Sequence, residues 1–361
     1  MDRTPLVTLP PALAPNAPRG DGRYVLGIDG GATKTLAAVL DLERLEAHVA
    51  QTGPSNEDAV GLRAAVDALI GVAEEAAARA GVTFEQLARS VVAVAGTDTE
   101  SIDREVRSRR AEWIVVNDVV GAWAAATDAS PGVAVISGTG SNVFGVGRDG
   151  RSWRAGGWGH LLGDEGSGYW LGAESIKLAL RDRDGTGPPS ALSGEVVSFF
   201  GATSVEALAA EVYSKPLTKA DIAAFAKVTA ALAARGERDA RELYARGARE
   251  LGAQIVAVIR ETGLASSAER FPVGLIGSAF HAGDVFVGPL RDCVGEEAAN
   301  AAVTVVDTPP VAGSLMLAAH GCVAGADLTA TSLAPVLARA LGGPVPSRSR
   351  SASLIDSAPS Q

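Results

Sequence analysis

Two glycine-rich segments are candidate phosphate-binding loops. They read DGGATKT at 29–35 and SGTGSN at 137–142, and each directly follows an apolar stretch. Glycine lets backbone amides approach a phosphate closely, and the hydroxyls of Thr33, Thr139 and Ser141 add hydrogen-bond donors. One such turn alone is more often a plain hairpin, but two at matched positions favour a nucleotide site. Neither segment has the Walker A spacing, which argues against a P-loop NTPase.

Two aspartates at the ends of apolar stretches have the chemistry that phosphoryl transfer needs. Asp29 borders the first loop, where a carboxylate can hold Mg²⁺, usually through water because that ion dehydrates reluctantly. Asp118, in VVNDV, can act as a general base that accepts the proton of an attacking hydroxyl. Structural roles compete with both: Asp29 suits a turn, and Asp118 suits a helix N-cap. For Asp118 the two roles are compatible.

A third segment, AGGWGHLLGDEGSG at 155–168, has the composition of a ligand-binding loop. Its glycines permit close approach to a polar ligand. Trp158 can stack on the apolar face of a sugar, and Asp164 and Glu165 can accept hydrogen bonds from hydroxyls. We expect His160 to be a structural residue that bonds backbone groups rather than a catalytic or metal-binding one.

Two further glycine-containing turns give weaker indications of ligand binding. GVGRDG at 145–150 matches the dinucleotide-binding pattern Gly-x-Gly-x-x-Gly, but no helix pattern follows it, so a hairpin turn is predicted. GLIGSAF at 274–280 follows an apolar strand and comes late enough in the chain to meet a nucleotide base or ribose.

The elements that would position these residues alternate between strands and helices. The pattern predicts strands at 24–28, 35–40, 91–94, 114–116, 133–136, 273–276 and 303–306, and helices at 58–80, 102–110, 119–127, 168–181, 205–213, 219–234, 237–261, 284–297 and 311–323. This alternation indicates an α/β fold with buried sheets, and the two loops suggest an internal duplication. The segments 1–22 and 343–361 are predicted to be disordered tails.

Composition narrows the class of protein. The 361 residues, 47% hydrophobic and 20% charged, suffice for two domains. A net charge of −10 argues against nucleic-acid binding, which needs a basic surface. Cys293 and Cys322 lack metal-binding or redox spacing and are expected to be buried, inert thiols. The sequence has neither a signal peptide pattern nor a membrane-spanning apolar run, which predicts a cytoplasmic protein with no membrane partner.

With these segments assembled, the chain resembles the N-acetylglucosamine kinase branch of the actin-like ATPases, the group that also includes the BadF/BadG/BcrA/BcrD ATPases. The likeness extends from about Arg23 to Leu341, and its most specific parts are IDGGATKT, NDVVGAWAAA, ISGTGSN and GGWGHLLGDEGSGYWLG. The resemblance implies a duplicated actin-like fold, of the ribonuclease H-like and hexokinase type, around a nucleotide cleft. It implies an N-terminal domain at 23–137 and a C-terminal domain with a helical insertion at 138–342.

The resemblance also implies an activity and roles by motif position. The activity would be ATP- and Mg²⁺-dependent phosphorylation of an amino sugar, N-acetylglucosamine or glucosamine, at the 6-hydroxyl, by a homodimer. Asp118 would be the catalytic base and Asp29 the metal ligand. The ATP-binding set would comprise Asp29, Gly30, Gly31, Thr33, Lys34, Gly138, Thr139, Gly140, Gly277 and Ser278. The sugar-binding set would comprise Asn56, Asp118, Asn142, Gly157, Trp158, Asp164 and Glu165.

One departure from the relatives and several alternatives stay open. The relatives often have Ser-Gly after the third strand, where this chain reads VAGTD at 94–98, which leaves one sugar contact and the acetyl preference open. N-acetylmuramic acid and anhydro sugars are also candidate substrates. An activator ATPase of 2-hydroxyacyl-CoA dehydratases would need paired cysteines for a bridging iron–sulfur cluster, a role that Cys293 and Cys322 do not suit. A transcriptional regulator would need a DNA-binding domain, for which 1–22 is expected to be too short. A non-catalytic sugar sensor is disfavoured by the presence of both aspartates.

Overall fold

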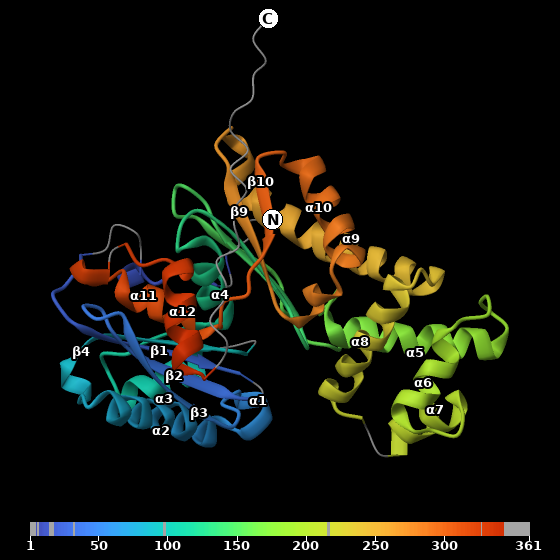
Figure 1. Cartoon of the computed structure of the whole chain (residues 1–361), viewed down its shortest axis with the longest axis horizontal. Helices are drawn as coiled ribbons and strands as arrows, with labels where there is room; N and C mark the ends of the chain where they lie inside the picture. The colour runs from blue at the N-terminus through green and yellow to red at the C-terminus, as the bar shows by residue number, and fades with distance from the viewer. Residues whose placement is uncertain are drawn as a thin grey trace, which may run out of the picture.

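Two five-stranded mixed sheets form the framework of the molecule, each in its own lobe (Figure 1). The structure is a computed structural model that describes residues 5, 7–13, 18–31, 33–96, 99–214, 217–325 and 327–342. In Figure 1 the first sheet lies in the lobe coloured mostly blue to teal, and the second sheet lies in the lobe coloured green to orange.

The two sheets have the same topology. The first comprises β1 (Tyr24–Gly30), β2 (Thr35–Asp41), β3 (Glu46–Thr52), β4 (Leu87–Val94) and β5 (Ile114–Asn117) in the order β3-β2-β1-β4-β5. The second comprises β6 (Gly132–Ser137), β7 (Ser141–Val146), β8 (Ser152–Gly156), β9 (Phe271–Ile276) and β10 (Ala301–Val305) in the order β10-β9-β6-β7-β8. In both, three antiparallel strands precede two parallel ones. The predicted internal duplication is confirmed.

Helices cover these sheets and form the insertion in the second half. They are α1 (Glu57–Val60), α2 (Leu62–Ala80), α3 (Glu100–Arg109), α4 (Asp118–Thr127), α5 (Gly168–Asp184), α6 (Leu192–Phe200), α7 (Val205–Ser214), α8 (Lys219–Ala234), α9 (Arg238–Glu261), α10 (Asp284–Glu297), α11 (Val311–Ala319) and α12 (Ala330–Ala340). No single helix of the described part of the chain has the length and apolar composition to cross a membrane, although α6 and α7, bent by 46°, meet both conditions when taken together.

The first sheet is buried on both faces. Its strands carry apolar residues toward α2 on one side and toward α4 and α11 on the other. Helix α4 also packs on the second sheet through Trp123, whose ring meets that of Phe144 edge-on at 6.4 Å. Helices α4 and α11 cross so closely that a Cβ on Gly313 would lie 1.7 Å from the backbone oxygen of Gly121. The interface between these two helices therefore requires glycine.

The lobes exchange segments in a way that corrects the expected domain boundaries of 23–137 and 138–342. Strand β6 (Gly132–Ser137) already belongs to the second sheet, pairing with β9. Helices α11 and α12 return to the first lobe, where their apolar faces join the core that contains β1 and β2. Sequence order alone misassigns them because an apolar helix does not indicate which sheet it covers.

The N-terminal segment also differs from the predicted disordered tail. Pro11–Leu13 forms a 3₁₀ helix, and the Leu13 side chain is buried in the first core. Gly20 pairs with the chain after α11, donating to the Gly321 oxygen at 2.8 Å and accepting from the Val323 amide at 3.1 Å. Backbone pairing and a buried leucine thus order the described part of 1–22, while the predicted C-terminal tail at 343–361 lies outside the described residues.

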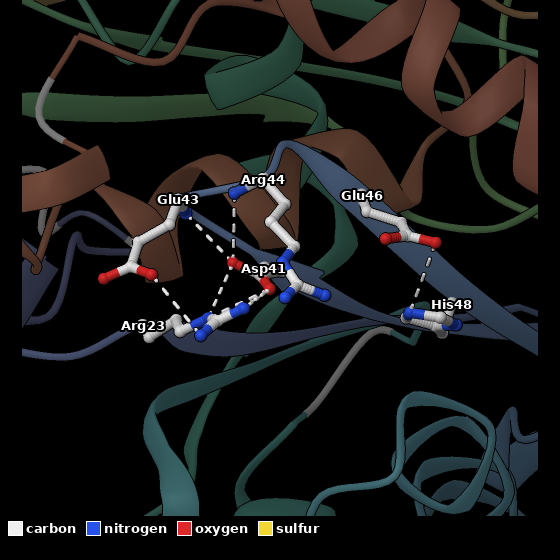
Figure 2. A network of polar contacts seen from close by, with 6 residues as sticks. All are labelled: Arg23, Asp41, Glu43, Arg44, Glu46 and His48. Atoms are coloured by element: carbon white, nitrogen blue, oxygen red, sulfur yellow. Dashed lines mark hydrogen bonds and ion pairs between the residues drawn. The ribbon is translucent and has the colours of Figure 1, made fainter.

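A half-buried ion pair between Arg23 and Asp41 closes the first hairpin where β2 ends (Figure 2). Asp41 accepts from Arg23 Nε at 3.0 Å and from the backbone amides of Glu43 and Arg44 at 3.0 and 3.1 Å. The Arg23 guanidinium holds the pKa of the Asp41 carboxyl below its usual range. This network fixes the turn into β3 at the end of the hairpin opposite the first glycine loop.

Candidate active site

The predicted functional residues gather at the carboxyl edges of the two sheets. Strands β1, β4 and β5 are parallel, so their carboxyl ends meet at one edge, with Asp29 near the end of β1 and Asp118 directly after β5. Strands β6 and β9 are parallel in the second sheet, and Gly138 and Gly277 follow their ends. Carboxyl edges of this kind are where ligands bind in α/β sheets.

The first loop is a tight turn supported by the segment before α1. The Gly31 amide donates to the Lys34 oxygen at 3.1 Å, and its oxygen accepts from the Ser55 amide at 3.0 Å. A Cβ on Gly30 would lie 2.5 Å from the Ser55 hydroxyl oxygen, so only glycine fits there. Thr33 and Lys34 are exposed, which leaves both side chains available to a ligand.

The two aspartates influence each other's charge. Burial, and after it the negative charge of Asp118, raise the pKa of Asp29 to about 7, while the Lys34 ammonium acts in the opposite direction. Burial raises the pKa of Asp118 to about 6, against the Val119 amide and the Arg154 guanidinium, which favour the charged form. A carboxyl with a pKa near neutrality can both accept and release a proton, as a general base must.

The N-cap of α4 is Asn117, not Asp118. The Asn117 side-chain oxygen accepts from the Val119 amide at 3.2 Å, and its amide nitrogen donates to the Gly96 oxygen at 2.9 Å. Asp118 is the first residue of the helix, so the predicted capping role for it is wrong. The preceding residue caps the helix, and the Asp118 carboxyl lies in the first turn, where backbone amides favour its charged form.

The second loop is tied to the start of α5. The Gly138 amide donates to the Gly140 oxygen at 2.9 Å, and the Gly138 and Thr139 oxygens accept from the amides of Gly168 and Tyr169 at 2.8 and 3.3 Å. Gly277 has φ of 124°, and a Cβ there would lie 2.3 Å from the Ser137 oxygen. The turn after β9 therefore needs glycine to pack against the second loop.

A cavity of about 470 Å³ opens beside this loop. Its walls come from the second loop, the alanine-rich face of α8, Tyr244 of α9, and the 3₁₀ helix Ser278–Ala282. They comprise Gly138, Thr139, Gly168, Ala220, Ala223, Ala224, Ala226, Lys227, Ala230, Tyr244, Ser278, Ala279, His281 and Ala282. Small-molecule pockets measure roughly 300–1,000 Å³, so the cavity can accept a planar base next to the phosphate loop.

The acidic pair of the 155–168 segment already has protein partners. Asp164 is 3% exposed; it accepts from the Ser141 amide at 3.2 Å and from the Lys219 ammonium at 2.7 Å. The Glu165 carboxylate accepts from Gln254 at 3.1 Å. Both residues fix the second loop region, and any sugar hydroxyl would bond to their remaining lone pairs.

The residues predicted to bind the sugar differ in how far their polar groups are already bonded to protein. Asn56 is buried; it caps α1 through the Ala59 amide at 3.1 Å and donates to the Ala95 oxygen at 2.7 Å. Asn142 has a buried side-chain oxygen with no partner in the described part of the structure. A Cβ on Gly157 would lie 2.8 Å from the Asn142 amide, so this pair needs glycine. Thr97 and Asp98, in the segment that departs from the relatives, lie outside the described residues.

Trp158 is the most accessible of the predicted sugar-side groups. It is 52% exposed, and the Arg154 guanidinium lies 5.3 Å from the centre of its ring. The His160 ring, expected to bond backbone groups, instead packs edge-on against Tyr169 at 4.9 Å. The 145–150 turn is the predicted hairpin, closed by the Gly147 amide on the Arg151 oxygen at 2.7 Å.

Three residues of the site were missed from the sequence. Arg154 of β8 interacts electrostatically with Asp118, Lys219 of α8 pairs with Asp164, and Gln254 of α9 bonds Glu165. Arg154 could not be found from the sequence, because no strand was predicted at 152–156 and the burial of Ser152 and Arg154 on β8 is visible only in the structure. Lys219 and Gln254 come from helices far along the chain, and nothing in the sequence pairs them with this loop.

Two sheets of the same topology, each with a glycine-rich loop of the phosphate-binding type at its carboxyl edge, define a nucleotide-binding protein of the actin-like fold. The sequence model of the BadF/BadG/BcrA/BcrD ATPase family matches residues 26–316, and the chain belongs to this family.

Curated relatives and solved structures agree with this assignment. The N-acetylmuramic acid/N-acetylglucosamine kinase of Clostridium acetobutylicum is 35% identical over 243 residues, 66% of this chain and 79% of the relative. The N-acetyl-D-glucosamine kinase of Dictyostelium discoideum is 27% identical over 310 residues, 81% of this chain and 97% of the relative. A crystal structure from Chromobacterium violaceum, provisionally assigned as an N-acetylglucosamine kinase, is 26% identical with a TM-score of 0.65, covering 82% of this chain and 99% of its own.

Proposed function

We propose that this protein transfers the γ-phosphoryl group of ATP to the 6-hydroxyl of an amino sugar, N-acetylglucosamine or glucosamine. The observation that carries the proposal is the pair Asp29 and Asp118, which meet at the carboxyl edge of the first sheet and interact electrostatically. The amino sugar kinases among the curated relatives support the same substrate class.

The two glycine loops and the cavity form the proposed ATP site. The backbone amides of the first and second loops, with Thr33, Lys34 and Thr139, would hold the phosphates, and the cavity bordered by Ser278 would take the adenosine. Asp29, near the end of β1 beside the first glycine loop, offers carboxylate oxygens to a magnesium ion, which prefers oxygen ligands and retains several waters. Asp29 would hold Mg²⁺, whose charge offsets the negative charge of the transferring phosphoryl group.

Asp118 performs the proton transfer in this mechanism. Its carboxylate takes the proton of the sugar hydroxyl as the oxygen attacks the γ-phosphorus, the bond from that phosphorus to the bridging oxygen breaks, and ADP leaves. Trp158 would stack on the sugar ring, while Asn56, Asn142, Gly157, Asp164 and Glu165 would surround its polar groups. Closing the lobes excludes water, which favours transfer to the sugar over hydrolysis.

The relatives and the composition support a cellular location, an oligomeric state and a class of partner for this activity. We infer a cytoplasmic homodimer that acts on a small-molecule substrate without a nucleic-acid or membrane partner. An activator-type ATPase finds little support, because Cys293 lies on α10 of the second lobe and Cys322 in the first core, and burial raises the pKa of both thiols. Cluster ligands must be thiolates, which these surroundings disfavour.

A coupled ADP-release assay tests the proposal. MgATP is supplied with glucosamine, N-acetylglucosamine, N-acetylmannosamine, N-acetylmuramic acid or glucose, and the product is examined by phosphorus and proton NMR. Turnover on one amino sugar with phosphate on its 6-oxygen is expected. ADP release that no sugar stimulates would move the assignment to an activator ATPase, and tight sugar binding without any ADP would indicate a sensor.

A further inference from the structure

Arg154 is a buried cation that the roles proposed above leave unused. It lies on β8, is 7% exposed, and is flanked by the glycine turn that precedes Trp158. Its Nη2 donates to the Gly157 oxygen at 3.2 Å, and its guanidinium lies 5.3 Å from the centre of the Trp158 ring. One side chain therefore holds both the backbone and the ring of the predicted sugar platform.

The same guanidinium, on β8, interacts electrostatically with Asp118 at the start of α4. Its positive charge favours the ionised form of that carboxyl, and the Asp118 charge in turn favours the protonated guanidinium. Arg154 forms no ion pair within 4.0 Å among the described residues, and its Nε is buried without a hydrogen-bond partner there. A buried arginine with a purely structural role would be expected to have a carboxylate partner and satisfied donors.

The unpartnered donor lies among unpartnered acceptors. The buried side-chain oxygens of Asn142 and Gln254 also have no partner in the described part of the chain. A Cβ on Gly156 would lie 2.2 Å from the Gln254 oxygen, and one on Gly157 would lie 2.9 Å from the Asn142 oxygen, so both line the turn that Arg154 holds. Buried polar groups are normally satisfied, and unsatisfied ones clustered at one turn indicate a polar ligand that bonds them.

We propose that Arg154 is a positioning residue that holds the Gly157 backbone and the Trp158 ring in place, so that the sugar bound on this platform presents its hydroxyl to the Asp118 carboxylate. The inference rests on the proposed kinase function and adds a residue to it. Arg154 suits this role because a guanidinium can stack on an aromatic ring with its flat face while its edge donates hydrogen bonds.

Two substitutions of Arg154, with one control variant, separate the effect of its charge from the effect of its shape. In Arg154→Gln both are lost, and we expect kcat to fall about tenfold and the sugar KM to rise about tenfold. Arg154→Lys keeps the charge but not the flat fork, so kcat should recover to within about threefold while the sugar KM stays raised. Arg151→Gln is the matched control, because Arg151 is exposed on the same hairpin and pairs only with Asp149 among the described side chains; its constants should not change.

A merely structural role would give a different pattern. Both Arg154 variants would then lower the thermal midpoint and the active fraction together, reducing kcat with the sugar KM unchanged, and that result would overturn the proposal. If Arg154 acts through the platform, the KM increases of Arg154→Gln and Trp158→Phe must be less than additive in the double variant. Full additivity would contradict the inference.

A binding measurement keeps the inference separate from the kinase proposal. Subtracting the emission of each protein's Trp158→Phe counterpart isolates Trp158 fluorescence, which is titrated with N-acetylglucosamine without ATP. If sugar quenches the Trp158 fluorescence of the wild type but the protein releases no ADP, the kinase function alone is refuted. Weaker quenching in Arg154→Gln, with Arg151→Gln unchanged, would still support the positioning role. Equal quenching in wild type and Arg154→Gln, or no response in either, would overturn it.

Discussion

At the scale of single residues, the site depends on which groups the fold leaves free. Asn117 caps α4, so the neighbouring Asp118 carboxyl is not needed as the cap, although the Val119 amide still favours its charged form. Asp164, by contrast, is bonded to the second loop and to Lys219. The sequence shows which acidic residues border the loops, but not which of them the backbone uses, because that depends on contacts between distant segments.

Replacing the base tests the assignment of Asp118 most directly. Asp118→Asn keeps the size of the side chain but removes its ability to take a proton. We expect kcat to fall by about 10²–10⁴-fold with little change in sugar affinity, because general bases contribute rate in this range. Steady-state kinetics give the first quantity and sugar titration by calorimetry the second. An equal loss of both would show that Asp118 binds the sugar without acting as the base.

The raised pKa values predict a pH dependence of the reaction. Asp118 acts only when deprotonated, and burial raises its pKa to about 6, with Asp29 at about 7. The kcat/KM for the sugar should therefore be constant at alkaline pH and fall toward tenfold per pH unit below about pH 6. The profile is recorded with the coupling enzymes in excess at every pH. A flat profile down to pH 5 would contradict the assignment.

At the scale of elements, much of the framework was predictable and part of it was not. Buried strands such as β1, β4 and β6 are continuous apolar runs, and α2 and α9 have clear helical periodicity. Strands β3, β7 and β8 were missed, and two of them, β3 and β8, are edge strands with few buried residues. Helices α6 and α12 were missed as well: α6 reads LSGEVVSFF, in which Gly and β-branched and aromatic residues weaken the helix pattern, and α12 contains Pro335.

The crossing of α4 and α11 gives a prediction for an element interface. A Cβ on Gly313 would overlap the Gly121 backbone oxygen, so Gly313→Ala should lower the free energy of unfolding by about 2–4 kcal/mol by forcing the helices apart. Gly71→Ala is the control: it lies inside α2 with open space at its Cβ and should gain about 0.5–1 kcal/mol from helix propensity. Urea denaturation measures both. Equal effects would show that the crossing can adjust.

At the scale of the whole molecule, the site is assembled from both lobes. The first lobe supplies Asp29 and Asp118, and the second supplies Arg154, Trp158 and the cavity beside Ser278. The duplicated sheets could be predicted because the two glycine loops repeat at matched positions. The return of α11 and α12 to the first lobe could not, since their apolar residues would fit either sheet.

Gathering carboxyls in the cleft has a cost in stability that depends on pH. A carboxyl whose pKa is higher in the folded protein than in the unfolded chain favours folding in its protonated form. Its contribution is therefore complete below about pH 4, the unfolded pKa, and is lost as the pH rises through the folded values of about 6 for Asp118 and about 7 for Asp29. Above pH 7 the free protein holds two partly buried negative charges that interact.

Removing one charge should consequently make the ligand-free protein more stable at alkaline pH. At pH 8 we expect Asp118→Asn to raise the free energy of unfolding by about 1–2 kcal/mol over wild type, a gain that shrinks toward zero at about pH 3, where Asp118 is largely protonated in both states. Asp292→Asn, at an exposed position of α10, should show no such pH-dependent difference. Urea denaturation at both pH values measures the gains. Lower stability of Asp118→Asn at pH 8 would mean that the Asp118 charge is already compensated in the folded protein, and the raised pKa of the base would have to be abandoned.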